Sequence, residues 1–389
     1  MAALRGGGIG RLILLWWAGV NLRITLLAVP PVIPSIHQDL DVSQTMIGIV
    51  TGLPVLLLAL AAVFGAFLIS KLGARRALLI GLVVVGVASA LRGVGPSVSQ
   101  LLSMTFVMGI GVAVMQPALP AIVRDWFPAS VGLATAVYAN GLLVGEILSA
   151  ALTIPYVLPL LGDSWPWSLA FWSVPAILTA LAVMLLIPKE ASLPKGTMPT
   201  WRLDWRGRTG WSVGLILAGA ASLYFTANAF IPDLLTATGE SARIGGALTS
   251  LNAGQIPASF LLLLFSRHLI GPRWPVLGAA VLGAFGVGGL LASSGTWLIA
   301  WAGLIGFAAA FILIWTLAMP AMLADPADVH RVSAMVFTVG YFYAFVSPFI
   351  GGVLWDLTGR PGAGFVPAAV GMAAILAGAW LLPSKRAAS

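Results

Sequence analysis

The chain of 389 residues is far richer in apolar residues than a water-soluble domain. Hydrophobic residues make up 60% of it and charged residues 8%, whereas an ordinary soluble domain is roughly half apolar and a quarter charged. This composition excludes a soluble globular protein. Because a transmembrane helix needs about 20 apolar residues, the sequence can supply about twelve spans and leaves too little for a sizeable soluble domain.

Charge and cysteine content narrow the function further. The net charge of +8 would suggest nucleic-acid binding in a soluble protein. The sequence contains no cysteine and only three scattered histidines, His37, His268 and His330, which excludes disulfides, cysteine nucleophiles and a zinc site of the usual spacing. It also lacks the Gly-x-x-x-x-Gly-Lys-Ser/Thr phosphate loop. We therefore expect no metal, no cofactor and no direct use of ATP.

Apolar runs separated by polar or Gly/Pro-rich stretches predict twelve transmembrane helices in two groups of six. The runs lie at about 12–36, 46–70, 76–95, 100–123, 131–154, 165–187, 210–232, 242–266, 273–292, 296–323, 332–355 and 363–382. The longest polar stretch separates the two groups. We thus predict an all-α integral membrane protein with an N-terminal six-helix bundle (1–187), a cytoplasmic linker (188–209) and a C-terminal six-helix bundle (210–389).

The positions of Lys and Arg predict the orientation of the chain. Positively charged loops are retained in the cytoplasm. With both termini inside, sixteen of the 20 cations lie in cytoplasmic segments and three, Arg92, Arg243 and Arg360, lie outside. The basic charge therefore indicates membrane topology, and no basic patch is left over for nucleic acid.

A short internal repeat supports two homologous halves. Ala118-Leu119-Pro120-Ala121 in the fourth predicted helix recurs as Ala318-Met319-Pro320-Ala321 in the tenth. The same shift of about 200 residues places Ile33-Pro34 on Ile231-Pro232, in the first helix of each half.

Arg23, the one cation that belongs to neither the cytoplasmic nor the outside set, is the most informative residue. It lies about eleven residues from either end of its helix, near the bilayer midplane, where an arginine costs about 3 kcal/mol on insertion scales. Transporters bind substrate at this depth, between their two halves, and a planar guanidinium suits carboxylate-like anions or heteroaromatic groups. Arg23 is therefore the candidate substrate ligand. The alternative is a structural pair with Glu146 or with helix-end carbonyls.

Asn21 and Glu146 are the other two candidates at mid-depth. Asn21 lies about 200° around the helix from Arg23, so the two side chains cannot point the same way, and one of them faces a neighbouring helix. Glu146 is the only acidic residue inside a predicted span. Because burial favours the protonated form of an unpaired carboxyl, Glu146 is the candidate proton-coupling residue. A packing role, protonated or locked to Arg23, is the alternative.

Further polar and aromatic residues within the spans can contact a solute. Polar groups in a membrane must face protein, water or ligand, and hydrogen bonding between helices is their alternative role. The candidates are Gln116, Tyr138, Asn140, Asn228, Asn252, Gln255 and Tyr341. Trp315 is the one tryptophan that we consider for substrate stacking, because most others lie near span ends, as in an interfacial belt. Arg92 is expected to snorkel to the membrane surface or to act as a gate residue.

Six plus six helices, a basic central linker and a short Gly/Arg loop between the second and third helices together resemble the major facilitator superfamily. The loop signature of that family, Gly-x-x-x-Asp-Arg/Lys-x-Gly-Arg-Arg/Lys, is met by Lys71, Gly73, Arg75 and Arg76, whereas Ser70 stands where the Asp is expected. The resemblance implies a gating or conformational role for these four residues. It does not carry over a charge relay through the missing Asp.

A narrower resemblance is to the cyanate and 2-nitroimidazole permease branch. It rests on Asn21-Leu22-Arg23 ahead of Pro30-Pro31-Val32-Ile33-Pro34, on Leu91-Arg92, and on Gly109-Ile110-Gly111 ahead of Gln116. Ile24 departs from the proline that usually follows Asn-Leu-Arg in that branch. The resemblance implies cyanate-like anions, small carboxylates or nitroimidazole-like compounds as substrates.

These observations predict a monomeric, multi-pass secondary transporter of the bacterial inner (plasma) membrane that works by alternating access. The first hypothesis is proton-coupled uptake of a small anionic, polar or heteroaromatic solute, with Arg23 as the central ligand and the proton as coupling ion. Efflux, exchange or facilitated diffusion of a small toxic aromatic compound is the second. A membrane receptor or an intramembrane enzyme is a remote third hypothesis.

Overall fold

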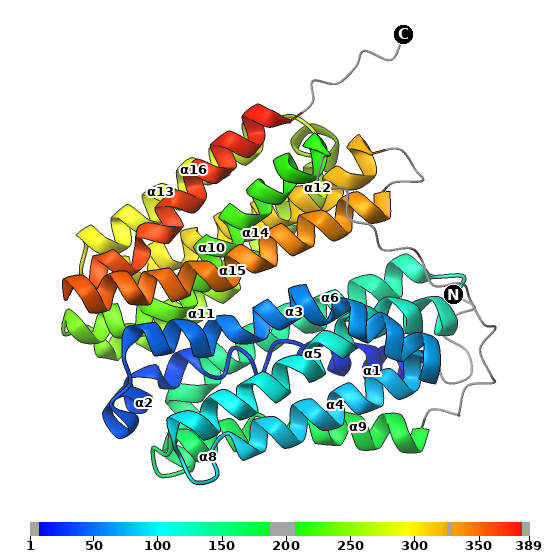
Figure 1. The fold of residues 1–389 in the computed structure, drawn as a ribbon, viewed down its shortest axis with the longest axis horizontal. Helices are drawn as coiled ribbons and strands as arrows, with labels where there is room; N and C mark the ends of the chain where they lie inside the picture. Colours follow the sequence, from blue (N-terminus) through cyan, green and yellow to red (C-terminus); the bar gives the residue numbers. More distant parts are fainter. Residues whose placement is uncertain (1–7, 187–206, 325–328, 383–389) are drawn as a thin grey trace. The chain divides into compact units, whose positions relative to one another are not determined.

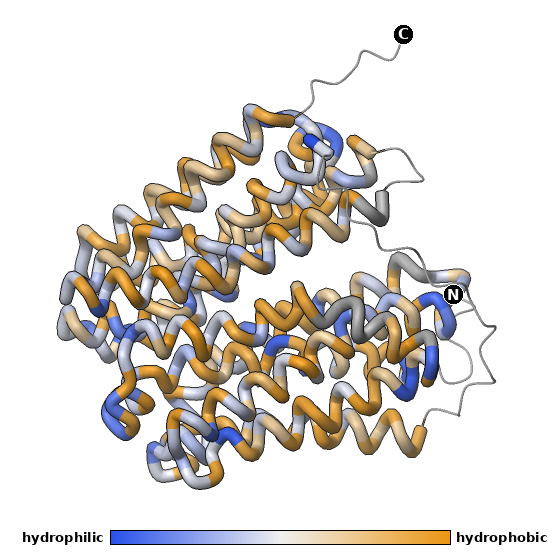
Figure 2. Tube along the Cα trace, viewed as in Figure 1, coloured by the Kyte–Doolittle hydropathy of each residue, from blue (hydrophilic) through white to orange (hydrophobic). Residues whose placement is uncertain are grey.

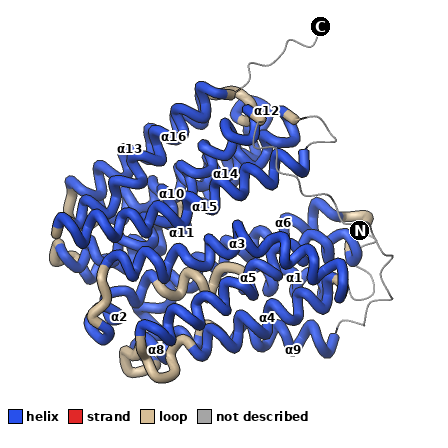
Figure 3. The backbone as a smooth tube through the Cα atoms, in the orientation of Figure 1, coloured by secondary structure: helices blue, strands red, loops and turns tan. Residues whose placement is uncertain are grey.

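The computed structural model describes residues 8–186, 207–324 and 329–382, and these described residues form helices and connections without a strand (Figure 3). By their packing they divide into two compact units. Unit 1 takes the described residues of Met1–Val42 and Leu53–Pro199, and unit 2 takes those of Ser43–Gly52 and Thr200–Ser389. The domain borders drawn from the sequence stay predictions, because nearly all of the 188–209 linker lies outside the described residues.

The helices of the N-terminal half begin and end as follows (Figure 1). They are α1 Gly8–Asn21, the 3₁₀ turn η2 Pro30–Val32, α2 Ile33–Leu40, α3 Gln44–Leu72, α4 Ala74–Leu91, α5 Val98–Trp126, α6 Val131–Leu152, the π-helical turn η3 Thr153–Val157, α7 Leu158–Leu160, α8 Trp165–Phe171 and α9 Val174–Leu186. The first residues of α3, up to Gly52, belong to unit 2, and the rest of α3 belongs to unit 1.

The helices of the C-terminal half all belong to unit 2. They are α10 Arg208–Ala237, the 3₁₀ turn η4 Ser241–Arg243, α11 Ile244–Ala253, α12 Gln255–Leu269, α13 Trp274–Ala292, α14 Trp297–Leu323, α15 Val329–Thr358, the 3₁₀ turn η5 Pro361–Phe365 and α16 Val366–Leu381. Helix α10 is the centre of this unit, since it packs against α14, α15 and α16 and most of its residues are buried.

Apolar residues cover the outside of the helices as well as their interior. Within the described residues, ten helical segments are long and apolar enough to cross a membrane, and Gln44–Leu60 is a shorter apolar helix. Large side chains such as Leu185, Leu357 and Trp380 are more than 70% exposed, as expected where lipid replaces water. Figure 2 shows hydrophobic residues along the helices and hydrophilic ones gathered at helix ends and connections.

The first predicted span, 12–36, is not one continuous helix, which corrects the sequence-based expectation. Helix α1 ends at Asn21, and residues 22–29 form successive turns that lead into η2 and α2 (Figure 3). Pro30 and Pro31 account for the end of this segment, because they have no N–H to bond the carbonyls of residues 26 and 27 and their rings crowd that turn. We call residues 22–29 the break segment.

Two further predicted spans are also interrupted. The span predicted at 242–266 is split between α11 and α12 at Gly254, and the one predicted at 165–187 is split between α8 and α9. At Gly254 a Cβ would collide with the backbone carbonyl of Gly303 in α14. The close approach of α14 therefore requires glycine here, and glycine also weakens the helix at this point.

Helices α1 and α6 are held together by glycines on both sides of their contact. A Cβ on Gly19 would collide with the backbone of Tyr138, and a Cβ on Gly141 or Gly145 would collide with the backbone of α1. Small residues let two membrane helices approach closely. This contact brings the end of α1, and the break segment after it, against the part of α6 that carries Glu146.

Candidate functional site

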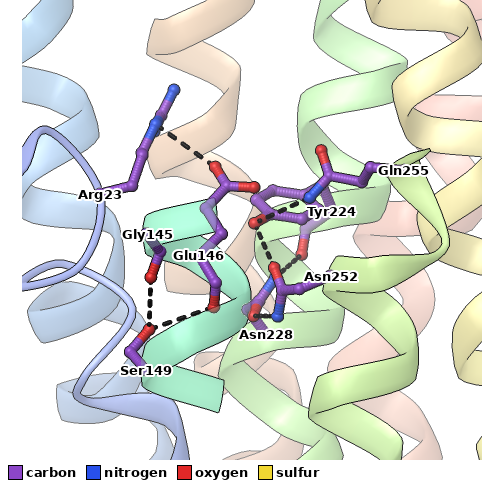
Figure 4. Close-up of polar contacts among 8 residues, drawn as sticks. All are labelled: Arg23, Gly145, Glu146, Ser149, Tyr224, Asn228, Asn252 and Gln255. Carbon is purple, nitrogen blue, oxygen red and sulfur yellow. Dashed lines mark hydrogen bonds and ion pairs between the residues drawn. The ribbon is translucent and has the colours of Figure 1, made fainter. Parts of the chain in front are cut away.

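Unit 1 contains a buried ion pair at the break segment. The Nε atom of Arg23 lies 3.4 Å from Oε1 of Glu146 on α6, and the two residues are 9% and 3% exposed. Figure 4 shows the contact between the Glu146 carboxylate and Arg23 Nε as a dashed line. The two mid-depth charges predicted from the sequence are thus partners. In a medium of low dielectric constant, removing one member of such a pair leaves a costly buried charge.

A chain of hydrogen bonds fixes the backbone that follows Glu146. Ser149 Oγ donates to the carbonyls of Gly145 and Glu146, at 3.2 Å each (Figure 4). Thr153 Oγ1 donates to the Ser149 carbonyl at 2.6 Å and accepts from Trp172 Nε1 at 2.9 Å. Thr153 begins the π-helical turn η3, a rare element that recurs at functional sites.

Asn21 and Arg23 contact different helices, although α1 ends at Asn21 and the helical separation expected between them does not apply. Its side chain is fully buried, and its amide donates to Thr179 Oγ1 on α9 at 3.0 Å and to the carbonyl of Trp17 at 2.8 Å. Arg23 instead reaches α6. The arrangement favours helix packing for Asn21, and solute contact for Asn21 remains a prediction without structural support.

Arg92 does not snorkel, which corrects that expectation. Its side chain is fully buried, and its Nη2 donates to the carbonyl of Thr25 at 2.8 Å and to Ser89 Oγ at 2.7 Å. A break in a helix leaves backbone carbonyls without intrahelical donors. Arg92 donates to one such carbonyl, that of Thr25, which lies two residues after Arg23.

Unit 2 contains a buried network of neutral polar groups. Tyr224 OH donates to Asn252 Oδ1 at 2.6 Å and accepts from Gln255 Nε2 at 3.5 Å. Asn228 Nδ2 donates to the Tyr224 carbonyl at 3.0 Å, and Asn252 Nδ2 lies 3.5 Å from Asn228 Oδ1 (Figure 4). Asn252 and Gln255 flank the interruption at Gly254. We call these four side chains the Tyr224 network.

The sequence reasoning identified three members of this network and missed Tyr224. Its signal was available, because Tyr224 and Asn228 are four residues apart on one helix and such residues share a face. The hydroxyl of Tyr224 connects α10 with both α11 and α12. It is therefore the residue that joins the three amides into one network.

The remaining solute-contact candidates are dispersed. Gln116 and Tyr138 are half-buried, and Asn140 is exposed and accepts from Trp16 Nε1 at 2.9 Å. Tyr341 stacks on Phe337 at a centroid distance of 5.7 Å. Trp315 is fully buried, and its Nε1 has no hydrogen-bond partner among the described residues. Its ring has no open face for stacking a solute in this structure.

The residues of the loop signature have different environments. Gly73 precedes α4 with a φ of 89°, a value that L side chains rarely adopt. Arg75 is buried and its Nη2 donates to the carbonyls of Val183 and Met184 on α9, at 3.2 and 3.1 Å. Lys71 and Arg76 are exposed. Their gating role stays a prediction.

The chemistry available at these two sites is ion pairing and hydrogen bonding. The buried charged side chains of the described residues are Arg23, Arg75, Arg92, Glu146 and Asp233. Over the same described ranges, no group of three or more His, Cys, Asp or Glu side chains could hold a metal ion. Groups of this kind can bind a small polar or anionic solute through charge and hydrogen bonds.

Helical bundles with apolar outer surfaces and buried polar clusters at helix interruptions are typical of secondary transporters. Comparison with known proteins agrees. Residues 15–218 match the family model of the Major Facilitator Superfamily, and the chain belongs to this superfamily. It is thus a multi-pass membrane transporter rather than an enzyme.

Two curated relatives confirm the resemblance to the cyanate and 2-nitroimidazole branch. The cyanate transport protein CynX of Escherichia coli (strain K12) is 28% identical over 362 residues, which cover 90% of this chain and 91% of the relative. The 2-nitroimidazole transporter of the same organism is 28% identical over 347 residues, covering 87% and 86%. Among solved structures, a D-xylose-proton symporter matches with a TM-score of 0.75 at 16% identity, covering 98% and 99%; this likeness supports the fold alone.

Proposed function

We propose that the protein is a proton-coupled transporter for a small monoanion or a flat polar heteroaromatic solute, with Arg23 as the central ligand. The observation that carries the proposal is the buried Arg23–Glu146 pair at the break segment. A guanidinium at a helix interruption combines a fixed positive charge with a planar array of donors. These two properties suit a small, flat, electron-rich solute.

The names of the relatives support this class of solute. One relative is named for cyanate, a small anion, and another for 2-nitroimidazole, a flat heteroaromatic compound with a nitro group. Both compounds present oxygen or nitrogen acceptors that a guanidinium can bind. We propose a solute from these two chemical classes.

The pairing suggests how proton and solute are coupled. When Glu146 is ionised, its carboxylate pairs with the guanidinium of Arg23 and neutralises the positive charge. When Glu146 takes up a proton, the guanidinium becomes available and an anionic solute replaces the carboxylate as its partner. When the proton leaves Glu146, the carboxylate again competes for Arg23 and expels the solute. One proton and one monoanion thus move together, without net charge transfer.

The Tyr224 network supplies a different kind of contact. We propose that Asn228, Asn252 and Gln255 bind the solute during its passage through neutral hydrogen bonds, and that Tyr224 orients them. Neutral amides hold a solute less strongly than a buried charge does, so the solute can dissociate from them readily. We further propose that the transporter acts as a monomer in the bacterial inner membrane and works in the direction of uptake.

Ligand binding to purified protein tests this function. Cyanate, acetate and 2-nitroimidazole are titrated while the thermal midpoint is followed, because a ligand at 100 times its dissociation constant stabilises the folded state by about 2.7 kcal/mol. We expect at least one solute to raise the midpoint of the wild type. Arg23→Ala is expected to abolish the shift, and Arg23→Lys to weaken binding roughly tenfold or more, because lysine lacks the planar fork.

The matched control is Arg124→Gln, which removes an exposed cation of the same unit and is expected to bind like the wild type. Equal midpoint shifts in the wild type and in Arg23→Ala would show that Arg23 does not contact the solute. No shift with any of the three compounds would contradict the proposed solute class.

A further inference from the structure

The buried charges of unit 1 do not balance. Among its described residues, the buried ionisable side chains are Arg23, Arg75, Arg92 and Glu146. Arg23 pairs with Glu146. Arg75 donates to two carbonyls in the last turn of α9, where the helix dipole places partial negative charge. Arg92 is the remaining cation.

Arg92 lies at the C-terminal end of α4 with its side chain fully buried. Its Nη2 donates to the Thr25 carbonyl and to Ser89 Oγ, both neutral groups. Among the described residues, Nε and Nη1 have no hydrogen-bond partner. The dipole of α4 supplies about half an elementary charge at that end, so the guanidinium keeps uncompensated positive charge and unused donors.

This surplus charge bears on the segment that carries the proposed ligand. The carbonyl bonded by Arg92 belongs to Thr25, two residues after Arg23 in the break segment. With Glu146 ionised, the two arginines and one carboxylate leave one positive charge in excess. With Glu146 protonated and a monoanion bound to Arg23, the excess is again one. In both states the interior of unit 1 attracts an anion and gains nothing from a neutral solute.

An unpaired buried charge is expensive to maintain. A neutral side chain such as glutamine could also bond the Thr25 carbonyl and Ser89, so the hydrogen bonds alone do not require arginine. The charge itself then needs an explanation, and attraction of an anion is one that a transporter can use.

We propose that Arg92 is a second anion-recognition residue, whose positive charge beside the break segment makes unit 1 select anionic over neutral solutes. This inference rests on the proposed function of Arg23. It adds a specificity determinant, because Arg92 distinguishes the two solute classes that Arg23 accepts.

Two substitutions separate the charge of Arg92 from its hydrogen bonds. Arg92→Gln keeps an amide donor and removes the charge, whereas Arg92→Lys keeps the charge and loses the planar fork. The dissociation constants of cyanate and of 2-nitroimidazole are measured for each variant, at a pH where 2-nitroimidazole is uncharged. Arg124→Gln, which removes an exposed cation of the same unit, is the control and is expected to match the wild type.

We expect Arg92→Gln to weaken cyanate binding roughly tenfold, the size of one Coulomb term at intermediate dielectric constant, and to change 2-nitroimidazole binding by less than about twofold. Arg92→Lys is expected to retain cyanate binding within about threefold. A loss of packing alone would weaken the binding of cyanate and of 2-nitroimidazole alike. A loss of affinity confined to cyanate would therefore be an effect of the charge.

A second variant keeps the test decisive if Arg92→Gln does not fold. Ser89→Asp places a carboxylate beside the intact Arg92 and neutralises it, so it is expected to lower cyanate affinity as Arg92→Gln does. Equal losses for both solutes, or equal losses in the Gln and Lys variants, would overturn the inference and leave Arg92 a structural residue. A wild type that binds 2-nitroimidazole but not cyanate would overturn the inference alone, and one that binds neither would contradict the proposed function as well.

Discussion

Several buried polar residues of this protein lie where the helices are interrupted. Arg23 and Thr25 lie in the break segment, and Asn252 and Gln255 flank Gly254. A broken helix exposes carbonyls and amides that lipid cannot satisfy, so neighbouring polar side chains must bond them. The bond from Arg92 to the Thr25 carbonyl is one such contact. At these two interruptions buried polar residues accompany the break in the helix, and they mark the candidate sites in both units.

Tyr224→Phe tests whether one hydroxyl holds the unit 2 network together. Its removal takes the donor from Asn252 Oδ1 and the acceptor from Gln255 Nε2. We expect a loss of about 1–3 kcal/mol in the free energy of unfolding, the usual cost of a buried group left unbonded, and a several-fold weaker affinity for the solute. Thermal unfolding and ligand titration measure the two effects. Tyr156→Phe, at a tyrosine that is 67% exposed, is the control, and equal effects of both variants would refute the assignment.

At the scale of elements, glycine decides where helices approach and where they bend. Gly19, Gly141 and Gly145 allow the α1–α6 contact that brings Glu146 against the end of α1, and Gly254 allows α14 to approach the α11–α12 junction. Membrane helices gain little from hydrophobic burial against each other, so close van der Waals packing contributes more to their association. The geometry of both polar clusters therefore depends on residues without a side chain.

Gly254→Ala is expected to be destabilising because its Cβ would collide with the Gly303 carbonyl. Overpacking of this kind costs about 1–3 kcal/mol, and the displacement of α14 should also weaken solute binding through Asn252 and Gln255. Gly288→Ala in α13 is the matched control, because its Cβ would meet nothing within 4 Å and alanine favours a helix. The measurement is the thermal unfolding midpoint of each variant in detergent, and we expect the midpoint of Gly254→Ala to be the lower one. A midpoint for Gly254→Ala at or above that of Gly288→Ala would contradict the packing argument.

At the scale of the whole molecule, the chain devotes nearly all its length to apolar helices and keeps few charges inside them. The described part buries one ion pair at a helix interruption in unit 1 and a neutral network at an interruption in unit 2. A transporter must bind its solute and also release it, so contacts that a proton can weaken are more useful than permanent ones. The Arg23–Glu146 pair has this property, since protonation of one partner removes the attraction.

Glu146→Gln tests the coupling in proteoliposomes that carry a pH gradient. With one proton moved per monoanion, wild-type protein is expected to accumulate cyanate about tenfold for each pH unit of the gradient. The variant imitates the protonated state permanently, so accumulation should vanish, binding should become independent of pH, and exchange of labelled for unlabelled solute should continue. Asp125→Asn, at an exposed carboxylate of the same unit, is the control. Unchanged accumulation in Glu146→Gln would exclude Glu146 as the coupling residue.

The sequence by itself determined the class of the protein and most of its spans, because hydropathy and length are local properties that a membrane reads directly. It also singled out Arg23 and Glu146, since a charge within an apolar run is costly wherever the helix packs. The interruption at Pro30-Pro31 was visible as well, yet the apolar run 12–36 concealed it.

Only the tertiary structure decided which side chains meet. The pairing of Arg23 with Glu146, the turn of Asn21 toward α9, the burial of Arg92 and the joining of three helices by Tyr224 all depend on which faces pack. In a membrane, apolar pattern does not tell a lipid-facing side from a protein-facing one, because both are hydrophobic. The partners lie between 28 and 158 positions apart in the chain, and a single sequence does not reveal which helix faces bring them together.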